Sequence, residues 1–326
     1  MQSLVDDIIW TGDDQFSLLM LGDVLGDRGA SDYLTMSLIE NIQNQAKIIG
    51  NPDPIRIIAS NHDLGVIGVN PGIGRYANNS SYGTAHIFHE ADELEKMYKN
   101  YFEQMKLFEY NLKTKSLFTH AKMSEEVNDQ KTFDNKLNIQ YLKIILGYNP
   151  EQSVTDVQEF VDRANEFFAS FIRRYYSSSN FVPSQYSIEK NWNKLTKFSA
   201  NIQTTYKFKD LQTKFDYTYE GFQDKGMDDV EAKKKSLIYV EFCILWNLVN
   251  QRSSEDTKLI TDNLSNYLHG HNTNEYKTYN DQYIGKTLQI CLDNNAQKYF
   301  ITNRLIPNTS NNEFRMDGIS PLYIFD

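Results

Sequence analysis

The fold can be predicted from two segments, Gly22-Asp23-Val24-Leu25-Gly26-Asp27-Arg28-Gly29 and Ser60-Asn61-His62-Asp63. Each follows a short, mostly apolar run, residues 18–21 in the first case and 55–59 in the second. Such runs are typical of buried strands, whose carboxyl ends deliver polar side chains to a crevice. Carboxylate, carboxamide and imidazole groups in that place suit divalent metal ions and a phosphate ester. The two segments therefore predict an α/β protein with a site at the ends of its strands.

Two later segments each carry histidine, Phe118-Thr119-His120-Ala121 and Tyr267-Leu268-His269-Gly270-His271. In this order the four segments resemble the calcineurin-like metallophosphoesterases, and specifically the phosphoprotein phosphatase branch. That family reads G-D-x-x-D-R-G, then G-N-H-E/D, then a lone His, then G-H. There are two departures, because Gly26 lengthens the first of these blocks by one residue and Ser60 replaces the usual glycine before Asn61. The resemblance covers residues 1–121 and 245–326.

The resemblance implies a set of metal ligands. Asp23 would bridge two divalent ions (Mn, Fe, Zn or Mg), because each carboxylate oxygen carries lone pairs. Asn61, His120 and His271 would complete the second metal site, and His271 matches the G-H pattern better than His269. The alternative for Asp23 is an aspartate that caps a turn, and for His120 a satisfied core histidine.

The resemblance also implies the catalytic groups. His62 would be the general acid that protonates the leaving oxygen, and Asp27 would hold its imidazole in one tautomer. Arg28 would bind two phosphate oxygens with its planar fork, and Arg252 is a further candidate for substrate binding. A metal-bridging hydroxide would attack the phosphate ester directly.

One block of the family is not found before Asp23, namely D-x-H, which would supply the first two metal ligands. Residues 2–10 have apolar side chains at helical spacing and look like the helix that follows this block in bacterial members. We therefore expect one well-bound ion and one incomplete site in the chain as written. An active full-length enzyme with the block upstream is the preferred interpretation.

The order of elements predicts the domain organisation. Up to residue 121, strands over 17–21, 55–59 and 116–119 alternate with helices over 31–48 and 90–105. The fold expected from the resemblance is an αββα sandwich of two mixed sheets, formed by residues 1–121 and 235–326. Residues 122–234 would form a largely helical insertion. The remaining predicted elements are helices over 142–146, 157–176 and 188–202, an apolar element over 239–249, a strand and turn over 287–296, and strands over 299–302 and 322–325.

Composition narrows the choice of partners. The net charge of −10 over 326 residues argues against nucleic-acid binding. The two cysteines, Cys243 and Cys291, fit a reducing compartment. No apolar run reaches the ~18 residues that a membrane span needs. We expect a cytoplasmic protein, or one secreted into a host cell if it is an effector.

Together these features predict a metal-dependent phosphomonoesterase, most simply a protein phosphatase acting on phosphoserine, phosphothreonine or phosphotyrosine. The alternative is a catalytically impaired relative that binds phosphoproteins or a partner through the helical insertion. The missing D-x-H block is the main support for that alternative.

Overall fold

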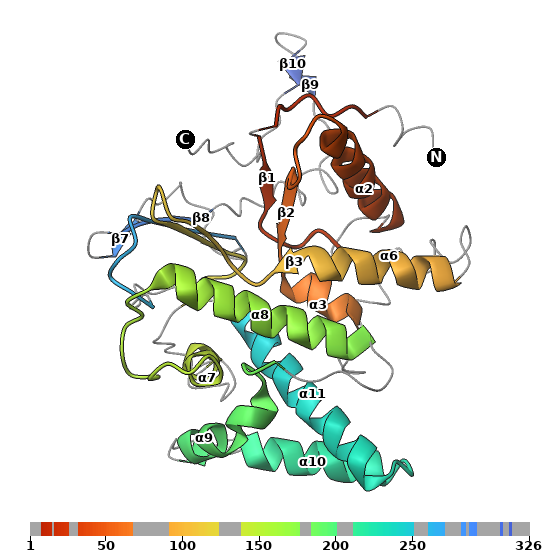
Figure 1. Cartoon of the computed structure of the whole chain (residues 1–326), viewed down its shortest axis with the longest axis vertical. Coiled ribbons are helices and arrows are strands. Elements are labelled where there is room, and N and C mark those ends of the chain that lie inside the picture. Colours follow the sequence, from red (N-terminus) through yellow and green to blue (C-terminus); the bar gives the residue numbers. More distant parts are fainter. Residues whose placement is uncertain are drawn as a thin grey trace.

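The computed structural model describes most of the chain, namely residues 8–14, 16–25, 32–67, 91–123, 138–176, 184–200, 211–250, 260–270, 282–284, 287–291, 307–308 and 313–314. Within these ranges the protein is a mixed α/β structure with two small sheets, a short strand pair and eight helices (Figure 1). The α/β class predicted from the sequence is therefore confirmed.

The first sheet has three parallel strands in the order β1-β2-β3. Its members are β1 (Leu18–Met20), β2 (Ile55–Ile58) and β3 (Met105–Lys106). The apolar run of β2 is buried, as expected for a strand with helices and a second sheet around it. The predicted strands over 17–21 and 55–59 are thus confirmed to within a residue or two at their ends.

The second sheet has five strands in the order β4-β5-β6-β8-β7. Its three central strands are parallel, and an antiparallel strand flanks them on each side. The bounds are β4 (Glu109–Asn111), β5 (Ser116–Thr119), β6 (Asn266–His269), β8 (Thr287–Cys291) and β7 (Gln282–Ile284). A separate antiparallel pair consists of β9 (Pro307–Asn308) and β10 (Glu313–Phe314). The predicted strands over 299–302 and 322–325 lie outside the described residues.

The two sheets share a small apolar cluster. Ile58 of β2 packs with Phe118 of β5 and Leu268 of β6, and Leu19 and Leu21 lie against them. His120, on the turn after β5, also reaches the first sheet, because its Nδ1 lies 2.6 Å from the carbonyl oxygen of Leu21. This contact brings the ends of β1, β2 and β5 together. The full sandwich of two mixed sheets stays a prediction, since the described strands of the first sheet are all parallel.

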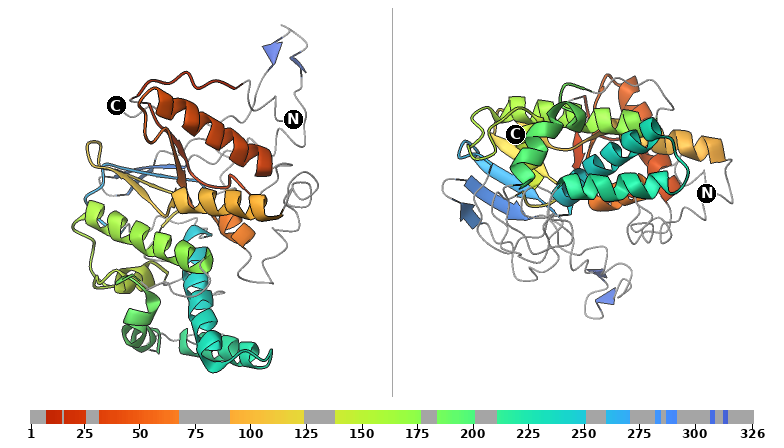
Figure 2. Two further views of the ribbon diagram at one scale, coloured as in Figure 1. Left: turned by 45° about the vertical axis from the view of Figure 1, so that its right-hand side comes forward. Right: turned by 90° about the horizontal axis from the view of Figure 1, so that it is seen from below.

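Three helices accompany the first sheet. Figure 1 and Figure 2 show α2 (Asp32–Ile48) and α6 (Ala91–Gln104) side by side next to it, and α3 (Asn61–Ile67) follows β2 directly. The predictions of helices over 31–48 and 90–105 are confirmed. Residues 8–10 of the helix predicted over 2–10 are not helical, and the others lie outside the described residues. The backbone at Ile8 and Trp10 instead hydrogen-bonds the side chain of Gln45 at 2.8 Å in both cases.

The rest of the described chain is largely helical and forms the lower part of the molecule in Figure 1. Helix α8 runs over the residues predicted for it because its phenylalanines recur on one face, and Asp156 Oδ1 accepts from Glu159 N at 2.9 Å at its start. The helices are α7 (Asn138–Ile145), α8 (Val157–Tyr176), α9 (Ile188–Ala200), α10 (Leu211–Gln223) and α11 (Asp229–Val249). Their apolar faces belong to one cluster with β2 and α6.

Helix α11 contains the predicted boundary at residue 234 and all of the apolar element predicted over 239–249. The division into a core and an insertion stays a prediction. Among the described helices, none combines the length and the apolar character that crossing a membrane requires.

Candidate metal centre

Three of the predicted ligands follow the carboxyl ends of parallel strands. Asp23 lies just beyond β1, Asn61 beyond β2 and His120 directly after β5. The chain turns sharply before Asp23, with φ of +89° at Gly22 and +53° at Asp23. Aspartate tolerates this left-handed region better than most residues. The sequence therefore places a carboxylate, a carboxamide and an imidazole at neighbouring strand ends, as predicted.

The side chains of these residues converge across the two sheets. His120 Nε2 lies 3.1 Å from Asn61 Oδ1 and 3.4 Å from Asp23 Oδ1. Asn61 and His120 are almost completely buried, at 1% and 3% exposure, whereas the Asp23 side chain is 28% exposed. The cluster is thus anchored in the core and open to solvent on the side of Asp23.

The other nitrogen of His120 fixes which atoms face the cluster. His120 Nδ1 lies 2.6 Å from the carbonyl oxygen of Leu21, which can only accept a hydrogen bond. Nδ1 therefore donates to Leu21, and Nε2 is the ring nitrogen that faces Asn61 Oδ1 and Asp23 Oδ1. With its lone pair free, Nε2 and these two oxygen atoms would be three electron-pair donors around one point, where a cation would stabilise them. The donor set of this cluster fits a divalent metal ion, and the Nδ1 contact is the kind that orients a metal-binding histidine.

Gly22 lets the two loops approach closely. A Cβ atom built at Gly22 would lie 2.6 Å from Cβ of Ser60 and 2.7 Å from Nδ1 of His120. Only a residue without a side chain fits between them, and glycine also adopts the positive φ at no cost. Gly22 is thus required by the packing of Asp23 against His120.

Asp63 forms hydrogen bonds that connect the segment after Asp23 with the start of α3 and with α6. Its fully buried carboxylate accepts hydrogen bonds from Ser60 Oγ at 2.6 Å, Leu25 N at 3.0 Å and Tyr101 Oη at 3.2 Å. Burial raises the pKa of Asp63 to about 7, the charge of Asp23 adds to the rise, and the three hydrogen bonds oppose it. The carboxylate holds the segment after Asp23 against the start of α3.

Ser60 and Tyr101 are the site residues that sequence reasoning missed. Ser60 departs from the family pattern, and it caps α3 from the position before Asn61, where its hydroxyl accepts from Asp63 N at 3.1 Å. Ser-x-x-Asp before a helix is a capping signal, so this role could have been found in the sequence. Tyr101 carries no such signal, because an aromatic residue on a predicted helix is normally expected to be part of the hydrophobic core.

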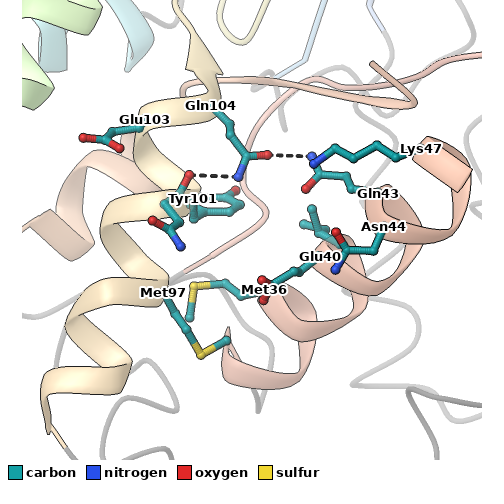
Figure 3. A pocket seen from close by; sticks show the side chains of 11 residues that line it. Met36, Glu40, Gln43, Asn44, Lys47, Met97, Tyr101, Glu103 and Gln104 are labelled. Carbon is teal, nitrogen blue, oxygen red and sulfur yellow. Dashed lines mark hydrogen bonds between the residues drawn. The ribbon is translucent and has the colours of Figure 1, made fainter. Parts of the chain in front are cut away.

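Tyr101 also lines a groove of about 340 Å³ between α2 and α6 (Figure 3). Gln104 bridges this groove by accepting from Gln43 Nε2 at 2.6 Å. Tyr101 is shared between this groove and the hydrogen bonds of Asp63, but none of the candidate metal ligands or catalytic residues lines the groove. Its other lining side chains include Met36, Ile39, Glu40, Lys47, Met97 and Glu103.

His62 is half-buried and follows Asn61 on the first turn of α3. Its predicted partners Asp27 and Arg28 lie outside the described residues, as do Arg252 and the fourth predicted ligand, His271. Gly270, which precedes His271, donates from its N–H to the carbonyl oxygen of His120 at 2.7 Å. The two histidine-containing segments are therefore adjacent.

His269 lies on the opposite face of β6 from the cluster. Its ring contacts that of Tyr267, with centroids 5.4 Å apart, and its Nδ1 lies 2.9 Å from the carbonyl oxygen of Gly270. Burial lowers the pKa of His269 to about 4, and the positive charge of Lys122 lowers it further. His269 is thus a neutral, fully buried side chain that faces away from the cluster, which agrees with the choice of His271 as the predicted ligand.

Among the described residues, no group of three or more His, Cys, Asp or Glu side chains could hold a metal ion. The cluster here has only two side chains of those kinds, Asp23 and His120, together with the carboxamide of Asn61. The candidate centre therefore depends on an uncharged oxygen ligand as well as on these two residues.

The fold and this donor set define an α/β protein with a candidate cation site at the ends of parallel strands. The sequence profile of the WipA-like phosphatase domain matches residues 17–212, more than half of the chain. The chain therefore belongs to the family of WipA-like phosphatase domains. Comparisons with the curated proteins and with the solved structures gave no match.

The family match confirms that this is a phosphatase-type domain, and it supports a hydrolase activity on phosphate esters. The matched residues include Asp23, Asn61, His62 and His120 and extend through most of the predicted insertion. The finer assignment to the calcineurin-like metallophosphoesterases remains a prediction.

Proposed function

We propose that this protein is a metal-dependent phosphomonoesterase that removes phosphate from serine, threonine or tyrosine in proteins. The observation that carries the proposal is the convergence of Asp23, Asn61 and His120 from three strand ends. Membership of a phosphatase family supports the reaction class. The geometry supports the metal dependence, because the three donor atoms suit a divalent ion.

The ion would be held by Asp23, Asn61 and His120, with His271 as a fourth ligand. Oxygen donors from a carboxylate and a carboxamide suit Mg²⁺ and Mn²⁺, and imidazole also suits Zn²⁺ and iron. When bound, such an ion polarises the phosphoryl oxygens and lowers the pKa of water, which makes hydroxide available at neutral pH.

The protein's own residues then supply binding and proton transfer. His62 sits at the start of α3 beside Asn61, where a general acid would protonate the departing alcohol or phenol. Arg28 would bind the phosphate with its planar guanidinium, and Asp27 would orient His62. Arg252 is proposed as a second contact for the phosphate.

A phosphorylated protein or peptide is the proposed substrate. The helices after residue 122 are proposed to shape access to the site or to dock a partner. The place of action is proposed to be the cytoplasm, or a host cell if the protein is delivered as an effector.

Hydrolysis of p-nitrophenyl phosphate with Mn²⁺ tests the proposal most directly. The Asp23→Asn variant keeps the shape of the side chain but removes the charge that would hold the ion. We expect it to lose at least about 100-fold in kcat/KM, because loss of a group that only orients a metal ligand already costs about 10- to 100-fold. Asp162→Asn, an equal charge change at an exposed position of α8, should retain full activity.

Metal binding provides a second readout. A bound ion stabilises the folded state, by about 2.7 kcal/mol at 100 times its Kd, so Mn²⁺ should raise the melting temperature of the wild type. Asp23→Asn should abolish this rise. Should Mn²⁺, Mg²⁺, Zn²⁺ and Fe²⁺ alike neither support hydrolysis nor raise the melting temperature of the wild type, the catalytic proposal fails and phosphoprotein binding becomes the working hypothesis.

A further inference from the structure

A buried turn carries His120 from β5 into the cluster. Thr119, Ala121 and Met123 on either side of it are at most 2% exposed. The turn follows Thr119, which forms with His269 the last pair between β5 and β6. The position of the imidazole therefore depends on what holds this turn.

The hydroxyl of Tyr267 on β6 contacts the turn at three points. It lies 2.9 Å from Thr119 Oγ1 and 3.3 Å from the carbonyl oxygen of Ala121, and it accepts from Met123 N at 2.5 Å. Thr119 Oγ1 itself donates to the Ala121 carbonyl at 2.7 Å. Tyr267 is 1% exposed, so these hydrogen bonds are shielded from water.

Gly270, the residue after β6, also holds His120 directly, because its N–H donates to the carbonyl oxygen of His120. Strand β6 and the residue after it thus contact the turn before, at and after the histidine. A phenylalanine at position 267 would fill the same space but would leave Met123 N–H and the Thr119 hydroxyl without this partner. Buried polar groups that lose a partner are costly and move to find another.

We propose that Tyr267 is a positioning residue of the metal centre, whose hydroxyl fixes the His120 turn so that Nε2 stays within reach of Asn61 and Asp23. The inference rests on the proposed function, since it concerns the same site. Groups that orient a metal ligand in this way typically change metal affinity by about 10- to 100-fold when removed.

Titration of the full chain with Co²⁺ tests the proposal, because the visible absorption of bound Co²⁺ reports both affinity and ligand geometry. Tyr267→Phe is compared with Tyr141→Phe, which removes an equally buried hydroxyl that donates to Ser199 at 3.3 Å in the helical region. Both variants should melt at a lower temperature without metal. Only Tyr267→Phe should bind Co²⁺ about 10-fold more weakly or more and show an altered spectrum.

The possible results separate this proposal from the proposed function. If the wild type itself binds no Co²⁺, the metal centre and the positioning role both fail. If the wild type binds but Tyr267→Phe matches it in affinity and spectrum, only the positioning role is overturned. If Tyr267→Phe does not fold, Thr119→Val decides, since it removes the hydroxyl between Tyr267 and Ala121 and should shift Co²⁺ binding in the same direction.

Discussion

His120 Nε2 lies 3.1 Å from Asn61 Oδ1, although 59 positions separate the two residues and they follow strands of different sheets. The contact depends on the apolar cluster between the sheets. Ile58 lies shortly before Asn61 and Phe118 shortly before His120, so the packing of these two apolar residues brings the two polar residues together. The polar cluster and the apolar cluster therefore form neighbouring layers. Packing between the sheets sets the distance between the donor atoms.

Ser60→Ala should lower the free energy of unfolding by about 2–3 kcal/mol, because it removes a helix cap and a donor to a buried carboxylate at once. Ser60 Oγ donates to Asp63 Oδ2 at 2.6 Å and accepts from Asp63 N at 3.1 Å. Urea unfolding followed by circular dichroism measures the loss.

The matched control is Ser187→Ala. Ser187 is also fully buried and caps α9, where Lys190 N donates to its hydroxyl at 3.4 Å, but the residue three positions on is a lysine rather than an aspartate. We expect a loss of about 1 kcal/mol there. Equal losses for the two variants would mean that Asp63 does not depend on Ser60.

Much of the fold could be predicted because its elements have clear periodicity. The strand over 116–119 and the helix over 157–176 have the predicted bounds, since an apolar run or a phenylalanine face ends where polar residues begin. Helix α3 was missed because Asn61-His62-Asp63 resembles a ligand-bearing loop. Helix α10 was missed because residues 211–223 are mostly polar and its buried residues include Lys214.

The site was predictable only in part. Asp23, Asn61 and His120 could be named because they stand in recognisable segments, and the structure brings them together. Hydrophobic periodicity predicts strands but not their order in a sheet, so the adjacency of β5 and β6 was not foreseen. Tyr267 was read as part of a histidine segment, since the role of its hydroxyl depends on that adjacency.

Arg174→Met should lower the free energy of unfolding by about 3–5 kcal/mol at neutral pH, because it leaves the carboxylate of Glu241 buried without its cation. Arg174 Nη2 donates to Glu241 Oε2, and Ile188 N donates to Oε1 at 3.0 Å. Both side chains are almost fully buried, at 3% and 0% exposure.

This loss should depend on pH with a definite sign. Burial raises the pKa of Glu241 above its ordinary value, and the charge of Arg174 opposes the rise. An acid whose pKa is higher in the folded state favours folding at low pH, and this contribution disappears as pH rises through the folded-state pKa. The loss in Arg174→Met should therefore be smallest near pH 5 and larger at pH 8.

Urea unfolding at four pH values measures this trend. Arg173→Met, on the exposed side of the same helix, should cost less than about 0.5 kcal/mol at every pH. A loss in Arg174→Met that does not vary with pH would contradict the assignment of the cost to the Glu241 carboxylate.

Gly22→Ala should be much more damaging than Gly50→Ala, although both glycines have φ of +89°. Nothing lies within 4 Å of a Cβ built at Gly50, so that variant bears only the backbone cost of about 1–2 kcal/mol. At Gly22 the added Cβ would lie 2.6 Å from Ser60 Cβ and 2.7 Å from His120 Nδ1. Overpacking of this kind adds about 1–3 kcal/mol, and the displaced imidazole should also bind Co²⁺ more weakly.

Urea unfolding and Co²⁺ titration of both variants separate the backbone cost, which both share, from the overpacking that only Gly22→Ala introduces. Adding Ser60→Gly to Gly22→Ala removes one of the two close contacts, so it should restore part of the Co²⁺ affinity even though the cap of α3 is lost. If Gly22→Ala and Gly50→Ala lose the same stability and bind Co²⁺ alike, the loops carrying Asp23 and His120 can separate without consequence. The close approach of Gly22 to His120 would then not be what sets the geometry of the centre.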